Sequence, residues 1–229
     1  MKPQYHGLHY IESSIRPENP AYSAVANKVK NGTMIAMGNG TGPGRGILLQ
    51  RQGDGHYRMY CVVAVPENFA VASSGGIDLS DLDATRALFL SPGFFADWAE
   101  DFREFIRHAT DFYSWPLYNH PYTAESKKWD SVPGVTVAGD AAHTSTPFAG
   151  EGVNCAMTDA LALADKIAAA LVAGEGGEGD SLDQAVRSYE EDMFARGVRL
   201  ITKSSRNGQL LFYQEGPEPL VQLLKSGSL

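Results

Sequence analysis

The pattern of apolar and polar positions divides the chain into a strand-rich first half and a helix-rich second half. Loose alternation over residues 5–15 predicts a strand, and a short helix is predicted over residues 22–30. Three further strand-like runs follow, at residues 33–37, 46–51 and 57–65. Because the linkers between these runs are rich in glycine, we expect a small antiparallel meander.

Beyond residue 78 the apolar positions change to helical spacing. Ser80 and Asp81 can cap a helix, and mostly aromatic residues then recur at helical intervals: Phe94, Trp98, Phe102, Phe105 and Ala109. Residues 112–118 return to a strand-like composition. The apolar run over residues 134–138 ends at Gly139-Asp140 and predicts a short buried strand.

The residues after Gly152 predict two long helices. In the first, apolar positions step by three and four over about six turns and define one face: Val153, Met157, Leu161, Ala164, Ala168 and Leu171. Residues 175–179 predict a surface loop, a second helix begins at Ser181, and residues 219–224 add a short third. We therefore expect an α+β fold, with a sheet and helices over residues 1–118 and long helices over residues 119–229.

Composition and charge narrow the class of protein. The 229 residues carry a net charge of -8 without a Lys/Arg cluster, so a nucleic-acid partner is not expected. No apolar run reaches the roughly 20 residues that a bilayer span needs. Cys61 and Cys155 form no C-x-x-C pair and follow no secretory leader. We expect two buried thiols in a protein of the reducing cytoplasm.

The segment from Gly139 to Asp159 has an arrangement suited to a planar, anionic ligand. A strand ends at Asp140, Pro147 stiffens a loop of small residues, and Gly150 and Gly152 introduce the first long helix. Glycines allow a flat ring to approach the backbone because they carry no Cβ. The first N–H groups of the helix lack an intrahelical acceptor and lie at the positive end of its dipole.

These residues carry a resemblance to a known family. The pattern Gly-Asp-Ala-Ala-His over residues 139–143, followed by Pro147, Gly150, Gly152, Asn154 and Asp159-Ala160, resembles the second FAD motif of single-component FAD-dependent aromatic-type monooxygenases. That group includes para-hydroxybenzoate hydroxylase and the tetracycline-degrading monooxygenases. The resemblance implies an antiparallel or mixed substrate-domain sheet, C-terminal helices and the flavin-side half of an FAD-binding domain. It also implies FAD as the cofactor, with NAD(P)H as a transient reductant, and an aromatic or polyketide-like small molecule as the substrate.

The same resemblance assigns roles to six residues. Asp140 would bind a ribityl hydroxyl of FAD, Pro147 and Gly150 would lie at the flavin ring, and the N–H groups around Gly152, Val153 and Asn154 would face its pyrimidine edge: these are the predicted cofactor-binding residues. A helix start at that edge favours the anionic reduced flavin by roughly 1 to 2 kcal/mol. No protein residue is assigned as catalytic, because the cofactor supplies the difficult chemistry.

The chain also departs from the family. No stretch satisfies G-x-G-x-x-G, because the glycines between residues 38 and 46 fail at the third glycine and lie between two strands. We therefore expect a truncated monooxygenase whose missing FAD half-site a separate chain could supply. The alternative from another class is a non-catalytic ligand-binding or partner-binding module without stable FAD.

Two other kinds of site are disfavoured. A hydrolase built on Asp140, His143 and Ser145 would need a presented nucleophile, and no G-x-S-x-G motif exists. His143 is therefore interpreted as a structural histidine. His6 and His9 lie in a strand-like segment, where their spacing does not suit a metal ion, so no metal site is predicted.

Overall fold

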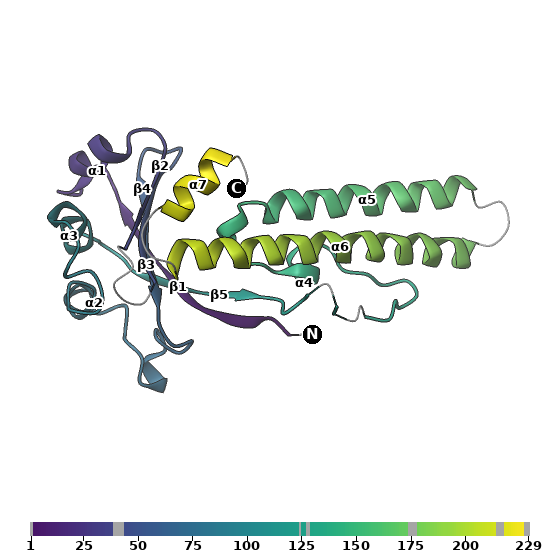
Figure 1. The fold of residues 1–229 in the computed structure, drawn as a ribbon, viewed down its shortest axis with the longest axis horizontal. Helices are drawn as coiled ribbons and strands as arrows, with labels where there is room; N and C mark the ends of the chain where they lie inside the picture. Colours follow the sequence, from purple (N-terminus) through teal and green to yellow (C-terminus); the bar gives the residue numbers. More distant parts are fainter. Residues whose placement is uncertain are drawn as a thin grey trace. The chain divides into compact units, whose positions relative to one another are not determined.

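The computed structural model describes residues 2–38, 44–123, 125–126, 129–173, 178–213 and 218–226. The chain folds into two compact units (Figure 1). The sheet unit comprises Tyr5–Leu117 and Gln209–Ser228, and the helical unit is essentially Tyr118–Gly208. The glycine-rich stretch at residues 39–43 and most of the loop predicted at 175–179 lie outside the described residues.

The sheet unit is built on five strands in the order β2-β3-β4-β1-β5. Their bounds are Gln4–Ile15 for β1, Thr33–Met37 for β2, Arg45–Arg51 for β3, Tyr57–Ala64 for β4 and Tyr113–Asn119 for β5. The pairs β2·β3, β3·β4 and β4·β1 are antiparallel, and Cys61 of β4 lies opposite both Ile47 and Ile11. The predicted α+β class and the meander of the second to fourth strands are confirmed.

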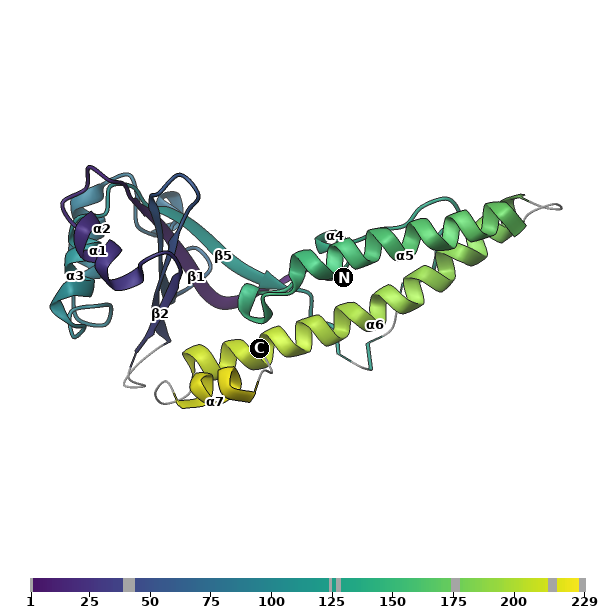
Figure 2. The same cartoon turned by 90° about the horizontal axis from the view of Figure 1, so that it is seen from above.

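Three helices cover one face of this sheet: α1 (Tyr22–Val29), α2 (Leu82–Phe89) and α3 (Glu100–Arg107) (Figures 1 and 2). Ile11 and Ile47 from the strands and Phe89, Phe95 and Phe105 from the helical side are fully buried together in one core. Burial of these side chains is the main source of stability for the unit, at about 1.5–3 kcal/mol per large apolar residue.

The helical spacing of the aromatic residues after position 78 does not correspond to one helix. Asp81 caps α2 as predicted, because its side chain accepts the N–H of Ala84 at 3.0 Å. Helix α2 then ends, and Pro92-Gly93, with a φ of +91° at the glycine, carries the chain through turns to α3. Proline lacks the N–H that a helix interior needs. Phe94 and Trp98 therefore lie in the turns between the two helices, and Phe102 and Phe105 lie on α3.

The helical unit contains two long antiparallel helices, α5 (Gly152–Ala173) and α6 (Glu178–Phe212), which lie side by side in both views (Figures 1 and 2). Ion pairs connect them along their length: Lys203 with Glu151, Arg196 with Asp159, and Lys166 with Asp192. The short α4 (Asp140–His143) precedes them, and α7 (Glu218–Ser226) belongs to the sheet unit. None of the described helices combines the length and the apolar character needed to cross a bilayer.

Three details differ from the expectations. Residues 134–138 form no strand, and only an isolated bridge joins Val132 to Val135, which is 61% exposed. A buried strand needs neighbouring strands for its backbone hydrogen bonds, and no described segment pairs with this run. Cys61 is buried as predicted, but Cys155 is only half-buried. The apolar face of α5 is exposed, and its large residues are 60–74% accessible: Val153, Met157, Leu161 and Leu171.

Candidate functional site

The candidate site is the motif segment, residues 139–154, which leads through α4 into the start of α5. Gly139 is the residue before α4 and has a φ of +59°. A Cβ at this position would lie 3.0 Å from the Cβ of Ala156. Both the left-handed backbone and the close approach of α5 therefore require glycine at position 139.

The predicted cofactor-binding residues lie together on the accessible side of the motif segment. Asp140, Pro147, Gly150 and Asn154 are exposed, as is Val153, while Gly152 is half-buried: these are the six residues that the sequence predicted. A Cβ added at Gly150 or Gly152 would meet no described heavy atom within 4 Å. The start of α5, with its unpaired first-turn N–H groups, is thus open to a ligand.

These features suit a flavin. An exposed carboxylate at Asp140 can accept a hydrogen bond from a ligand hydroxyl. Open space beside Gly150 and Gly152 admits a flat ring, and the N–H groups at the helix start favour an electron-rich edge.

Buried polar groups of α6 hold the loop that carries Pro147. The hydroxyl groups of Thr146 and Ser204 are 2.8 Å apart, and Ser204 also donates to the Thr146 carbonyl. The side-chain amide of Asn207 donates to the carbonyl of Phe148 at 3.0 Å. Because these bonds are buried, removing one partner leaves the other unsatisfied, at a cost of about 1–3 kcal/mol.

Asp159 is the centre of a buried network beneath the motif segment. Its side chain is fully buried, and Oδ2 accepts the N–H of Gly139 at 3.0 Å and lies 2.5 Å from His143 Nε2. Oδ1 accepts two hydrogen bonds from Arg196, from Nε at 3.1 Å and from Nη2 at 2.8 Å. The Asp159 carboxylate of α5 therefore binds Gly139 before α4, His143 at the end of α4, and Arg196 of α6.

The charges of this network balance if His143 is neutral. The guanidinium of Arg196 neutralises the Asp159 carboxylate, and His143 then acts as a neutral donor through Nε2–H. Its Nδ1 is buried and has no hydrogen-bond partner among the described residues. Helix α6 passes close to this ring, because a Cβ at Gly197 would lie 2.6 Å from the Cβ of His143.

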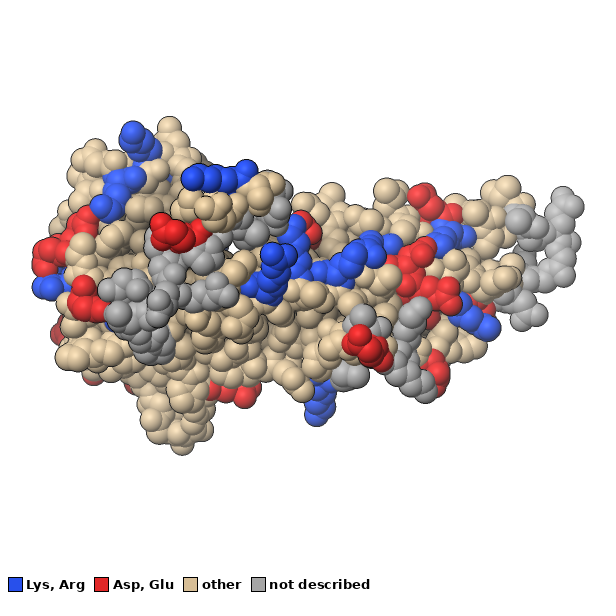
Figure 3. All heavy atoms as spheres, in the orientation of Figure 1, with Lys and Arg blue, Asp and Glu red and all other residues tan. Residues whose placement is uncertain are grey.

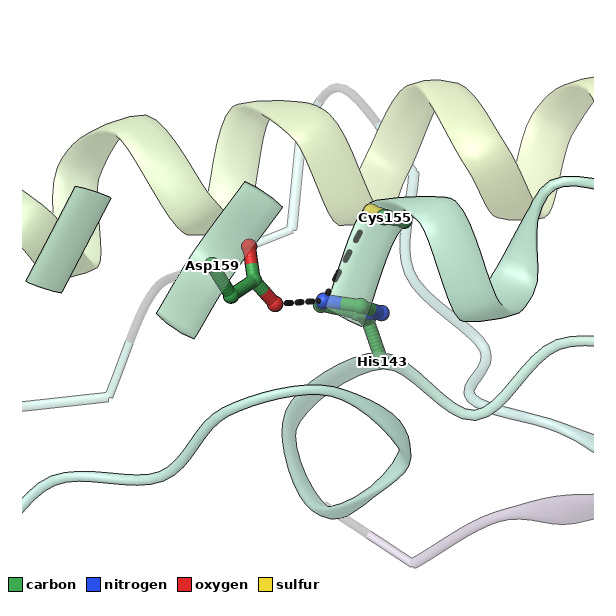
Figure 4. Close-up of side chains that lie close together, drawn as sticks. All are labelled: His143, Cys155 and Asp159. Carbon is green, nitrogen blue, oxygen red and sulfur yellow. Dashed lines mark hydrogen bonds and ion pairs between the residues drawn. The ribbon is translucent and has the colours of Figure 1, made fainter. Parts of the chain in front are cut away.

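The Cys155 thiol and the Tyr189 hydroxyl near Asp159 stay protonated at neutral pH. Cys155 Sγ lies 3.8 Å from His143 Nε2, the same ring nitrogen that faces Asp159 (Figure 4). Burial and the Asp159 carboxylate raise the pKa of the Cys155 thiol. The same two causes raise the pKa of Tyr189 to about 12, and its hydroxyl donates to the Val137 carbonyl at 3.1 Å. Neither group is prepared to act as a nucleophile.

A metal ion does not suit this cluster. The ligand atoms of His143, Cys155 and Asp159 lie within 4.8 Å of one another, which is compatible with a small ion in distance alone. However, Asp159 already accepts hydrogen bonds on both oxygens, and the adjacent guanidinium of Arg196 repels a cation. We interpret the cluster as a neutral hydrogen-bonded network.

The roles of Asp159 and Arg196 were missed at the level of sequence. Asp159 was recognised as part of the motif, but its partners lie 16, 20 and 37 positions away in the chain. Arg196 occurs among the charged residues of an amphipathic helix, and a lone arginine there ordinarily faces solvent. The helical pattern gave no signal for this burial, because Asp159 lies on the side of the helix opposite the predicted apolar face, and an unpaired aspartate ordinarily faces solvent.

Comparisons with known proteins agree with this geometry. Residues 125–204, which contain the motif segment and the Asp159 network, match the family described as FAD binding domain. A monooxygenase of Penicillium thymicola, penA, is 28% identical over 98% of this chain and 58% of its own length. The 3-amino-4-hydroxybenzoate 2-monooxygenase PtnB3 of Streptomyces platensis is 32% identical over 54% of this chain and 28% of its own.

Solved structures show the same fold. A salicylate hydroxylase in complex with its substrate is similar over 99% of this chain and 54% of its own, with a TM-score of 0.67 and 19% identity. Nearly all of this chain aligns with penA and with the salicylate hydroxylase, but it covers only about half the length of each of those proteins. The resemblance found in the sequence is confirmed: this chain is similar to FAD-dependent aromatic-type monooxygenases, and its residues 125–204 match the FAD binding domain family.

Proposed function

We propose that this chain is the flavin-side half of an FAD-dependent monooxygenase that hydroxylates an aromatic or polyketide-like small molecule. The observation that carries the proposal is the accessible motif segment, supported from below by the buried Asp159 network and lying within the FAD binding domain match. The similarity to a hydroxybenzoate monooxygenase supports an aromatic substrate. NAD(P)H is the proposed transient reductant.

Bound FAD would supply the redox chemistry with oxygen, while residues of this chain would orient it. The Asp140 carboxylate would accept a hydrogen bond from a ribityl hydroxyl, and Pro147 and Gly150 would lie beside the ring. The N–H groups of Gly152, Val153 and Asn154 would stabilise negative charge at the pyrimidine edge. Such a helix start is worth roughly 1 to 2 kcal/mol for the anionic reduced form, or about 20 to 40 mV for a two-electron couple.

The exposed apolar face of α5 supports a further part of the proposal. Met157 and Leu161 are 67% and 63% exposed, and Val153 and Leu171 continue the same face. Contiguous apolar surface of this kind marks a contact with another protein surface. Because the matched relatives are about twice as long, we propose that the other half of an FAD-binding domain covers this face, either in a longer chain or as a separate one.

The proposal is tested by FAD binding to the chain. We expect added FAD to quench the intrinsic fluorescence of the chain in a saturable way. Asp140→Ala should weaken FAD binding about tenfold, because a charge-assisted hydrogen bond is lost. Asp165→Ala is the matched control, since Asp165 is also an exposed aspartate and lies on α5, outside the motif segment. Equal affinity of both variants would contradict the assignment of Asp140.

The visible spectrum separates the two candidate functions. A purified chain with bound yellow chromophore, or one that takes up FAD, supports the flavoprotein. A chain that remains colourless and ignores added FAD supports the non-catalytic module, whose sheet and helices persist without the cofactor.

A further inference from the structure

We propose that the helical unit contains a second ligand site, a basic hollow between the start of α5 and α6 that binds a phosphate monoester. The hollow has a volume of about 480 Å³. Helix α6 contributes three cationic side chains to its wall: Arg196, Arg199 and Lys203. Basic side chains form a band over this part of α6 in Figure 3. The hollow shares Asn154 with the proposed flavin-binding residues, but its cations come from α6, which contributes none of those residues.

The three cations differ in how many of their N–H donors are available to an anion. Arg196 uses Nε and Nη2 for Asp159, so the Nη1 donors remain for a ligand. Arg199 is exposed and makes no hydrogen bond or ion pair with any described residue. Lys203 pairs with Glu151, with Nζ 2.5 Å from Oε1. Arg199 is therefore the cation that is free to make the first contact.

The charge of the hollow is opposite to that of the protein. Its three cations face two carboxylates, those of Glu151 at the rim and Asp159 beneath, so a positive charge remains uncompensated. The whole chain has a net charge of -8. Such a local field attracts an anion although the protein as a whole repels one.

The shape and the donors favour a phosphate monoester over a simple anion. Arginine presents planar pairs of N–H groups that match phosphate oxygens, and two arginines line this hollow. The volume is within the range of about 300–1,000 Å³ of small-molecule sites and exceeds what a phosphate alone fills. Leu200 adds an apolar wall for an organic group attached to the phosphate. The ribose 2′-phosphate of NADPH is a monoester of this kind, and inorganic phosphate presents the same oxygens without the organic group.

Glu151 allows a test in which a substitution should strengthen phosphate binding. Its carboxylate competes with a bound phosphate for Lys203 and repels it. Removing the negative charge should therefore strengthen phosphate binding, whereas removing Arg199 should weaken it. If the surface attracted anions only through its general positive charge, a change at Glu151 or Arg199 would alter the phosphate affinity no more than a change at another charged residue of α6.

The experiment is a titration of the ¹⁵N-labelled chain with inorganic phosphate at constant ionic strength, followed by two-dimensional NMR. We expect saturable shifts of the amides around Arg199 and Asn154. Arg199→Ala should weaken binding about fivefold to tenfold, because a hydrogen bond to a charged group is lost. Glu151→Gln should strengthen it about threefold. The matched control is Arg187→Ala, an exposed arginine nearer the start of the same helix, which should leave the affinity unchanged.

Competition then identifies the source of the phosphate. Displacement of phosphate by NADPH but not by NADH supports a monoester and assigns it to the 2′-phosphate of the nucleotide. No displacement by either would overturn the monoester and leave inorganic phosphate alone as the ligand. Shifts that do not saturate, or an equal loss of affinity in the Arg199 and Arg187 variants, would overturn the site. None of these results depends on FAD binding, so the flavoprotein proposal can fail separately.

Discussion

Replacing Asp159 should show how strongly the helical unit depends on one buried carboxylate. Asp159→Ala removes the acceptor of Gly139 N–H, of His143 Nε2–H and of two donors of Arg196. Arg196 is left with only 18% of its side chain exposed, so its charge is poorly solvated. Breaking such a buried pair from one side costs about 3–5 kcal/mol. We expect a loss of about 4 kcal/mol, a large part of the roughly 5–15 kcal/mol of a typical domain.

Asp159→Asn should be milder and should change the tautomer of His143. The amide keeps one oxygen for Arg196 or Gly139, and its NH₂ group can donate to Nε2 if the histidine proton moves to Nδ1. Only the charge of the pair and one acceptor are lost, for which we expect about 2 kcal/mol. The ¹⁵N shifts of the imidazole should therefore indicate Nε2–H in the native chain and Nδ1–H in the asparagine variant.

The assay is urea unfolding of each variant, combined with hydrogen exchange of the Gly139 amide, which reports on the helical unit directly. Asp165→Ala, an exposed aspartate on the same helix, should stay within about 0.5 kcal/mol of the native chain. If Asp159→Ala lost less than about 1 kcal/mol, or if Gly139 exchanged at the native rate, the network would not support the motif segment and the reasoning would be refuted.

Three further predictions concern single residues. Burial lowers the pKa of His9 below its ordinary 6.5, so the unfolded chain binds more protons than the folded chain below that pH. The stability of the sheet unit should be fully present above about pH 6.5 and should fall as the pH drops through the folded pKa. Urea midpoints measured at several pH values should show a flatter pH dependence for His9→Gln. Gly197→Ala should destabilise the helical unit by about 1–3 kcal/mol in the same assay, because its Cβ would overlap His143, and native stability would contradict the close approach. Gly152→Ala should leave the unfolding midpoint unchanged, since its Cβ meets no described atom, but should weaken FAD binding; unchanged FAD affinity would argue against ring contact at this glycine.

Elements that depend on local pattern were predictable from the sequence. The strands β1 to β4 and the helix α5 occur within a few residues of their expected bounds, because alternation and helical spacing are properties of contiguous residues. The run at residues 134–138 failed for the opposite reason. Its apolar composition is that of a buried strand, but a strand exists only when another segment supplies its hydrogen-bond partners.

The site shows the same division between local and distant information. Six cofactor-binding residues could be proposed from the sequence because they lie in one segment. The structure shows that this segment is accessible, and the contacts of these residues with FAD stay a prediction. The support beneath it could not be found, because Asp159 meets Arg196 only after α5 and α6 pack together. Periodicity gives the face of a helix but does not identify the residue opposite it.

The exposed face of α5 and the buried network beneath the motif segment lead to one expectation about how the two halves of the flavin site depend on each other. The network orders Gly139, α4 and the start of α5 through hydrogen bonds that all lie within residues 118–208. A ligand surface that is already ordered loses less conformational entropy on binding. The flavin-side surface should therefore be formed before any partner covers Met157 and Leu161, and covering that face should add contacts to FAD without rebuilding the motif segment.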